Sequence, residues 1–351
     1  MGPRIRVGCW LLGVAAGLAC QLRAETVTFL IARGEVEELR MVVGDKVHRR
    51  HPLGFNTVFG VSADKLVTIS QREEAGRAVQ RLTVFDLHTG SVLSERPVEA
   101  RLMTWLSGPE RVVLVPPKED AAYFAVLEVS GDSVATALAR FDLRTGKVGT
   151  FRIPEEVPNP RPFEVAGGVG VYSWNHGAMA LLDGVFRTIV TKVERPSTLV
   201  DPSARNACLS LPGVGVLRVT FSGKLELFDP APVEGASPRV LSLGTGVVGP
   251  EAATFDGKPV LVFGEAVRGA MGRAAVSALV VYDPIAGKPL WRKTLPWLAR
   301  AFTVSRDASL FRLMPLTSLE LTYYDRKSDS FTKSIALKPR EAESVVIVPS
   351  D

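Results

Sequence analysis

The chain has four histidines, at positions 48, 51, 88 and 176, and histidine is the side chain that most often ligates metals or transfers protons near neutral pH. None of the four belongs to an HExxH motif or to another recognised metal-ligand spacing. His48 and His51 would need a third ligand from elsewhere in the chain. The sequence also lacks a GxSxG elbow, a Walker loop and a dinucleotide fingerprint. It therefore predicts no catalytic, cofactor-binding or metal-ligating residue.

The stretch from Ser173 to Gly177 combines polar and aromatic residues more densely than any other short segment. We predict that it forms a loop between the second and third strands of a repeat. There Trp174, Asn175 and His176 would contact a ligand or partner. The alternative is a tight turn with a packed tryptophan, and the sequence leaves both interpretations open.

Two long excursions between strands are predicted on the face of the molecule that carries this loop. One runs over residues 116–120 and continues through 130–132, and the other spans 264–273. Loops longer than a fold requires often carry recognition. Arg268 and Arg273 are therefore expected to contact an anionic partner, and a surface insertion without function is the alternative. The acidic pair in the first excursion could bind a cation, but no calcium-loop spacing supports this.

The first 24 residues have the pattern of a secretory signal peptide. Arg4 and Arg6 precede an uncharged run, Val7 to Ala19, which is too short to span a bilayer as a helix. Small residues then lead to Ala24, and cleavage there would leave residues 25–351. An uncleaved signal anchor is one alternative.

A second alternative is a lipoprotein. Residues 17–20 loosely resemble a bacterial lipobox, so Cys20 is a candidate for lipidation, with residues 1–19 removed. After cleavage at Ala24 the sole cysteine is Cys208, which lies in an apolar run and is expected to be a small core residue without a nearby base.

Export changes the charge of the chain. The full sequence carries a net charge of +5, and residues 1–24 contain three arginines and no acid, so the mature chain carries 5 − 3 = +2. Acidic and basic residues are interspersed, which gives no support to a nucleic-acid partner. The basic cluster from Lys46 to His51 is interpreted as a solvated strand end rather than a phosphate groove.

Short strand signals run through the rest of the chain, and two patterns alternate. In the first, a strand ends in aspartate before a turn, as in residues 85–92 and 141–148. Its seven aspartates lie at positions 45, 86, 142, 183, 229, 283 and 325, with a mean spacing of about 47 residues. The distance counted through the two chain ends is also 47, as a closed ring requires. The second pattern is a polar turn between apolar strands, as in 61–66 and 304–310.

These spacings predict an all-β fold, a seven-bladed β-propeller of four-stranded antiparallel blades in a single domain, residues 25–351. In the last blade, residues 344–348 would pair with 26–31, followed by 37–43 and 46–50. The N-terminal strands would thus close the ring. Six or eight blades stay open as alternatives because two spacings are long.

Residues 279–291 resemble the repeat of pyrroloquinoline-quinone-like propellers, a WD40/YVTN-like class: a strand ends in aspartate, a Gly-Lys turn follows, and the next strand holds a tryptophan. Residues 84–92 and 140–148 resemble this repeat without the tryptophan. The Gly-His and Trp-Asp landmarks of WD40 blades are absent. Quinone enzymes of that family use an adjacent cysteine pair beside the cofactor, which this chain lacks, so the resemblance implies a non-enzymatic relative and no cofactor.

We therefore expect an exported, monomeric scaffold, periplasmic or extracellular, that binds a protein or polymer at one propeller face. The alternative is a hydrolase or lactonase-type propeller with a divalent cation in its central channel. The predicted innermost strands are mostly apolar, which counts against this alternative because such an enzyme needs polar metal ligands there. A lipid-anchored assembly factor is a third hypothesis, in which the membrane is reached only through Cys20.

Overall fold

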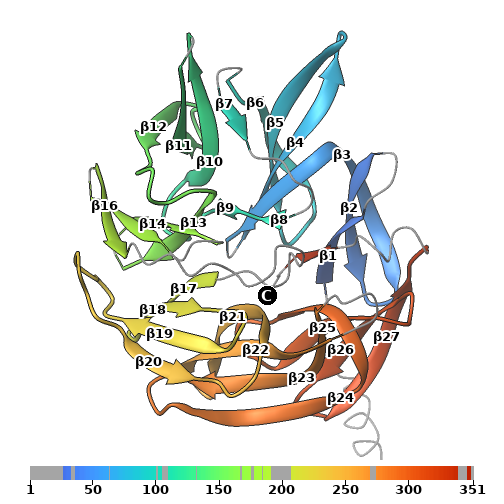
Figure 1. Ribbon diagram of the computed structural model, residues 1–351. Helices are drawn as coiled ribbons and strands as arrows, with labels where there is room; N and C mark the ends of the chain where they lie inside the picture. The colour runs from blue at the N-terminus through green and yellow to red at the C-terminus, as the bar shows by residue number, and fades with distance from the viewer. Residues whose placement is uncertain are drawn as a thin grey trace, which may run out of the picture.

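The computed structural model describes residues 27–32, 36–62, 64–99, 102–104, 110–131, 133–166, 168–174, 178–183, 185–190, 207–268, 274–338 and 346–348. Apart from turns, these residues form β-strands, and they include no helix that is long and apolar enough to cross a membrane. The strands gather into sheets around a common centre (Figure 1). Every strand pair is antiparallel except the short contact of β3 with β8.

The first sheet begins with the last described strand. Its order is β28-β1-β2-β3-β4-β5-β6, and β8 pairs with β3. The strands are β28 (Val346–Val348), β1 (Val27–Ala32), β2 (Glu37–Val43), β3 (Lys46–Val61), β4 (Lys65–Glu74), β5 (Arg77–Asp86), β6 (Val92–Pro97) and β8 (Glu110–Arg111).

Three smaller sheets follow along the chain. The first contains β7 (Leu102–Thr104), β9 (Val113–Leu114), β10 (Ala121–Ser130), β11 (Ser133–Asp142) and β12 (Val148–Arg152). The second contains β13 (Pro160–Val165), β14 (Gly168–Ser173), β15 (Met179–Asp183) and β16 (Val185–Val190). The third contains β17 (Ala207–Leu211), β18 (Gly215–Val219), β19 (Lys224–Phe228) and β20 (Arg239–Ser242).

The last sheet runs from β21 to β27 in sequence order. Its strands are β21 (Val247–Phe255), β22 (Lys258–Arg268), β23 (Ala274–Asp283), β24 (Lys288–Val304), β25 (Leu310–Pro315), β26 (Glu320–Asp325) and β27 (Ser330–Ala336). Like β3, β24 is unusually long, because its first half pairs with the strand before it and its second half with the strand after it. Each of these two strands therefore joins two four-stranded groups without a loop.

The change of partner within β3 occurs at Gly54, whose φ of +130° is a conformation that glycine adopts readily. An alanine Cβ at this position would lie 2.3 Å from the carbonyl oxygen of Gln71. Ser70 Oγ and Arg72 Nε donate hydrogen bonds of 2.6 and 2.7 Å to the carbonyl of Leu53. The bend is thus held by side chains of the next strand.

The predicted aspartate turns are confirmed at four positions. In each, one Oδ1 of the aspartate accepts hydrogen bonds from backbone amides two and three residues later, so that the turn satisfies its own polar groups. The aspartates and the amides are Asp86 with His88 and Thr89, Asp142 with Arg144 and Thr145, Asp283 with Ile285 and Ala286, and Asp325 with Lys327 and Ser328.

A side chain from the outer strand of one four-stranded group repeatedly reaches the aspartate turn of the next group. In most cases the donor is an arginine or lysine, and the acceptor is a carbonyl, hydroxyl or carboxylate oxygen of the turn. The pairs are Arg49 with Ser91, Arg96 with Arg144 and Thr145, Arg239 with Ile285, Lys293 with Asp329, and Ser334 with Gly44. The last of these joins β27 to the turn between β2 and β3.

The two ends of the chain meet in one sheet. β1 pairs with β28 in the register Phe29–Val348, as expected for residues 26–31 and 344–348. Leu30 is fully buried in a core cluster that also contains Tyr323, Ile335 and Ile347. The buried Thr28 hydroxyl accepts hydrogen bonds from Arg312 Nε at 2.9 Å and from the Tyr323 hydroxyl at 3.0 Å. β1 is therefore fixed to strands from both ends of the chain.

One prediction about the excursions is wrong. Residues 116–120 and 130–132 were expected to form one excursion on a single face. In the structure the ten residues of β10 separate Asp120 from Gly131, so the two turns lie at opposite ends of that strand. The run from Ala121 to Val126 pairs with β11 instead of forming a loop, because its side chains are almost all apolar and buried. Residues 264–268 of the second excursion are likewise part of β22.

Candidate functional site

Three hairpins are much longer than their counterparts. β4 and β5 have ten residues each, as do β10 and β11, and β22 and β23 have eleven and ten. The equivalent strands β18 and β19 have five residues each. In Figure 1 the hairpins β4–β5 and β10–β11 extend past the neighbouring sheets at the top of the view. We call the described residues at the far ends of these hairpins, together with Trp174 at the end of β14, the hairpin ends.

Apolar side chains are exposed near the hairpin ends. Val134 is 60% exposed and its cross-strand partner Val129 is 36% exposed, beside the turn between β10 and β11. Val267 is exposed near the end of β22. Single exposed valines are common, and these two, opposite each other on a projecting hairpin, form a small exposed apolar patch.

The hairpin β4–β5 presents charge instead of apolar surface. Arg81 Nε and Nη2 donate to the two carboxylate oxygens of Glu74 at 2.7 and 2.6 Å. This bidentate contact lowers the pKa of Glu74, against a smaller opposing effect of desolvation. The hairpin ends therefore differ in chemistry from one sheet to the next.

Trp174 follows β14 directly and precedes β15, which is the position predicted for it between second and third strands. Its side chain is half-buried and packs against a core cluster that includes Phe163 and Tyr172. The guanidinium carbon of Arg161 lies 5.7 Å from the centre of a Trp174 ring. This packing fits the alternative of a structural tryptophan in a turn, and the side chain stays partly accessible at a hairpin end.

The other predicted contact residues fall at or beyond the limits of the described chain. Arg268 is the last residue of β22, where its backbone pairs with Ala274. Cys20, Asn175, His176 and Arg273 lie outside the described residues. The part of the chain that the structure describes contains no group of three or more His, Cys, Asp or Glu side chains that could hold a metal ion.

The acidic pair of the first excursion is engaged by neighbouring polar side chains. Lys65 Nζ contacts Asp120 Oδ1 at 2.6 Å, across two neighbouring sheets. Glu119 Oε2 accepts a hydrogen bond of 2.7 Å from the Tyr123 hydroxyl and lies 3.7 Å from Arg140 Nη2. Both carboxylates therefore stabilise the start of β10.

Cys208 lies in β17 and is buried, with its thiol free. Desolvation raises its pKa to about 12, although the nearby charge of Arg218 acts in the opposite direction. The thiolate is the reactive form of cysteine. We therefore expect native protein to leave Cys208 unmodified by iodoacetamide at pH 8, and urea-unfolded protein to be alkylated fully, as measured by peptide mass spectrometry. Rapid alkylation in the folded state would contradict the buried position.

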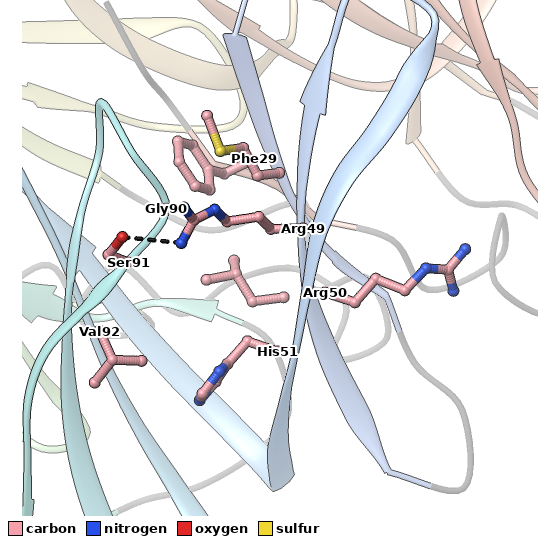
Figure 2. Close-up of a pocket in the computed structure, with 9 residues that line it drawn as sticks. Phe29, Arg49, Arg50, His51, Gly90, Ser91 and Val92 are labelled. Carbon is pink, nitrogen blue, oxygen red and sulfur yellow. Dashed lines mark hydrogen bonds between the residues drawn. The ribbon is translucent and has the colours of Figure 1, made fainter.

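A pocket of about 420 Å³ lies between β3 and the turn that joins β5 to β6 (Figure 2). It is lined by Phe29, Leu39, Met41, Arg49, Arg50, His51, Gly90, Ser91 and Val92. Arg49 Nη1 donates a hydrogen bond of 2.9 Å to Ser91 Oγ across the pocket. Figure 2 shows Arg50 pointing to the other side of β3, as strand alternation requires.

His51 forms one wall of the pocket and packs edge-on against Phe85, with ring centres 5.0 Å apart. Desolvation lowers the pKa of His51, the charge of Arg72 lowers it further, and Glu95 partly opposes both. The imidazole is therefore mainly neutral at pH 7. It can accept or donate one hydrogen bond, whereas Arg49 supplies a permanent positive charge.

The basic cluster at residues 46–51 predicts a solvated strand end, and the pocket is not predicted from the sequence. Within that cluster, Arg49 and His51 are two residues apart, so on a strand they share one face. That signal is present in the sequence. The partner is not, because Ser91 belongs to a turn 42 positions away, and only the packing of neighbouring sheets brings it to Arg49.

The chain matches no protein-family model, and no curated protein matches it. Solved structures do resemble it. A putative 6-phosphogluconolactonase from Bacteroides uniformis superposes with a TM-score of 0.54 at 12% identity, covering 92% of this chain and 99% of that one. A protein of unknown function from Desulfotomaculum acetoxidans gives 0.54 at 11% identity, covering 93% and 100%. A chain of the mitotic checkpoint complex gives 0.50 at 10% identity, covering 84% and 79%.

At these identities the likeness concerns the fold alone. It shows that this chain has antiparallel sheets arranged as in β-propellers, in agreement with the propeller predicted from the repeats. Structural neighbours of this kind include lactonases, proteins of unknown function and scaffolds, so the fold leaves the function open.

Proposed function

We propose that the protein is an exported β-propeller scaffold that binds a protein or polymer partner at the hairpin ends. The observation that carries this proposal is the extension of three hairpins beyond the length that their sheets need. In β4–β5 and β10–β11 the described residues at the far ends are exposed or half-buried, so the extra length there costs conformational entropy and adds little core. Its use therefore lies in contact with another molecule. The exposed pair Val129 and Val134 supplies an apolar centre for that contact.

We further propose that the propeller has seven four-stranded units and is closed. Division of β3 and β24 at their changes of partner gives four strands to each unit, when β7 and β9, which both pair with β10, are counted as one strand and the short parallel β8 is left out. Closure is supported by the pairing of β1 with β28. It is also supported by the hydrogen bond from Ser334 Oγ to the carbonyl of Gly44, because this bond links the last unit to the first in the same way as the outer strands of other units contact the next aspartate turn. In such a ring the second-to-third-strand turns of all units lie on one face.

For the N-terminus we propose the signal peptide that the sequence predicts. Residues 1–24 act as a signal peptide, which places the mature domain, 25–351, in the periplasm or outside the cell. Lipidation at Cys20 is the alternative, and it would anchor the domain to a membrane through its N-terminus. Palmitate labelling that disappears in Cys20→Ala separates the two, since cleavage after Ala24 removes Cys20 altogether.

The proposed binding face is tested with the double variant Val129→Asp, Val134→Asp. Two carboxylates on the projecting hairpin would have to be desolvated on binding. We expect the amount of partner captured from the envelope fraction of the producing cells to fall at least 10-fold, measured by affinity capture and quantitative mass spectrometry.

The matched control is Val240→Asp, since Val240 is also exposed but lies on the outer strand β20. It should capture as much partner as the wild type. Equal loss in both variants, or no loss in the double variant, contradicts binding at the hairpin ends. Stoichiometric retention of calcium or zinc together with lactone hydrolysis would favour the alternative of a channel-metal enzyme.

A further inference from the structure

The pocket between β3 and the β5–β6 turn is separate from the hairpin ends. β5 runs from the turn at residues 75–76, at a hairpin end, to Asp86, where the turn beside the pocket begins. The pocket therefore lies at the opposite end of the same strand. Any ligand that it holds is additional to the partner proposed above, and neither proposal depends on the other.

Arg49 keeps donors available inside the pocket. Among the described residues its guanidinium makes one hydrogen bond, from Nη1 to Ser91 Oγ. The corresponding contact between the next two sheets is different, because Arg96 donates from both terminal nitrogens to the carbonyls of Arg144 and Thr145. Both terminal nitrogens of Arg96 are therefore bonded to the turn, and its Nε is buried without a partner among the described residues, whereas Arg49 keeps Nη2 as well as Nε for a ligand.

The difference between the two arginines has a steric cause. At Gly146, a Cβ would lie 3.0 Å from Arg96 Nη1, so the guanidinium rests directly on the turn. At the equivalent Gly90, the nearest atom to a Cβ is the sulfur of Met41, at 2.8 Å. Met41 occupies the space above this turn and keeps the Arg49 head group away from its carbonyls, which leaves the pocket open.

The lining combines the positive charge of Arg49 with apolar side chains. Arg50 also lines the pocket, but its side chain points to the other side of β3, where Nη1 lies 3.4 Å from Glu38 Oε2. Its accessible apolar part is formed by Met41 and Val92, which are 9% and 41% exposed, with the buried Phe29 and Leu39 beside them, and none of the lining residues is acidic. Guanidinium groups bind carboxylates through two parallel hydrogen bonds. A volume of about 420 Å³ is within the range of small-molecule sites.

We propose that this pocket binds a carboxylate attached to an apolar group, with Arg49 on the carboxylate and Met41 and Val92 against the apolar part. His51 contributes one hydrogen bond from the side wall. A single arginine compensates one negative charge, which favours a carboxylate over a phosphate dianion. The carboxylate belongs to a free small acid or to the C-terminus of a peptide.

The test is calorimetric titration of the full mature chain with phenylacetate, phenylacetamide, acetate, inorganic phosphate and N-acetyl-Ala-Phe. We expect phenylacetate to bind at least 10-fold more tightly than phenylacetamide, which lacks the charge, and than acetate, which lacks the apolar group. Phosphate should bind more weakly than phenylacetate. Tighter binding of N-acetyl-Ala-Phe than of phenylacetate identifies a peptide C-terminus as the source, and the reverse identifies a free acid.

Variants then locate the site. Arg49→Gln should weaken phenylacetate binding at least 10-fold, while Arg239→Gln, which removes a comparable contact between two other sheets, should leave it unchanged. Ser91→Glu is a second test, for the case that Arg49→Gln fails to fold. It leaves Arg49 in place but gives its guanidinium a carboxylate partner within the protein, so it should also abolish phenylacetate binding. Equal affinity for phenylacetamide, tighter binding of phosphate, or unchanged binding in both pocket variants overturns the proposal.

Discussion

Leu30→Ala is expected to lower the free energy of unfolding by about 3 kcal/mol, as is typical for a buried leucine truncated in a core. Leu30 is fully buried, and its cluster is built from strands of both chain ends, including β1, β26, β27 and β28. The cavity would therefore lie at the junction on which the proposed closure depends. Urea unfolding followed by far-ultraviolet circular dichroism measures the change.

The matched control for that truncation is Leu93→Ala. Leu93 is 54% exposed in β6, so its replacement should change the free energy of unfolding by less than about 0.5 kcal/mol. If Leu30→Ala is as mild as Leu93→Ala, the side chain does not pack between the two ends of the chain. The proposal of a closed ring would then lose its main energetic support.

Gly60→Ala should destabilise the protein by a similar amount, about 3 kcal/mol, for the opposite reason: too little space. Gly60 lies in β3, where it faces the backbone of β9 in the next sheet. An added Cβ would sit 2.0 Å from the carbonyl oxygen of Val113, and a backbone atom cannot move aside as a flexible side chain can. The clash should separate β3 from β9.

Gly149→Ala provides the comparison for Gly60→Ala. Gly149 is also a strand glycine, in β12, but a Cβ added there would have open space around it, with no contact within 4 Å beyond its own chain neighbours. The alanine there should be neutral or slightly stabilising, because it reduces the entropy of the unfolded chain. Equal stability of the two variants would mean that β3 and β9 do not approach each other so closely. Thermal unfolding by calorimetry distinguishes the outcomes.

Local turn chemistry is the part of the fold that the sequence predicts best. In residues 85–92 and 141–148 the aspartate, its amide donors and the glycine lie within six positions, and the structure has the expected bonds at both turns. The pairing between the chain ends is also predictable, because the repeat count leaves one unit to be shared by residues 26–31 and 344–348. Both inferences rest on spacing along the chain.

Features that depend on contacts between strands and sheets are not predictable in the same way. The polar tip at Ser130 and Gly131 suggests a loop, although the ten residues on either side of it pair without interruption in β10 and β11. The pocket depends on whether Met41 or an arginine head group fills the space above a turn. A single sequence shows both residues but not which of them packs there.

The pairing of β1 with β28 has a consequence for the order of events during biosynthesis. β1 emerges before the other described strands, but Phe29 and Ile31 pair with Val348 and Val346, which are synthesised after all of those strands. The finished sheet thus cannot form on the ribosome until β28 has emerged. Until then, Phe29 and Ile31 lack the backbone partners that they have in the finished sheet, so this sheet is the last of the described sheets to be completed.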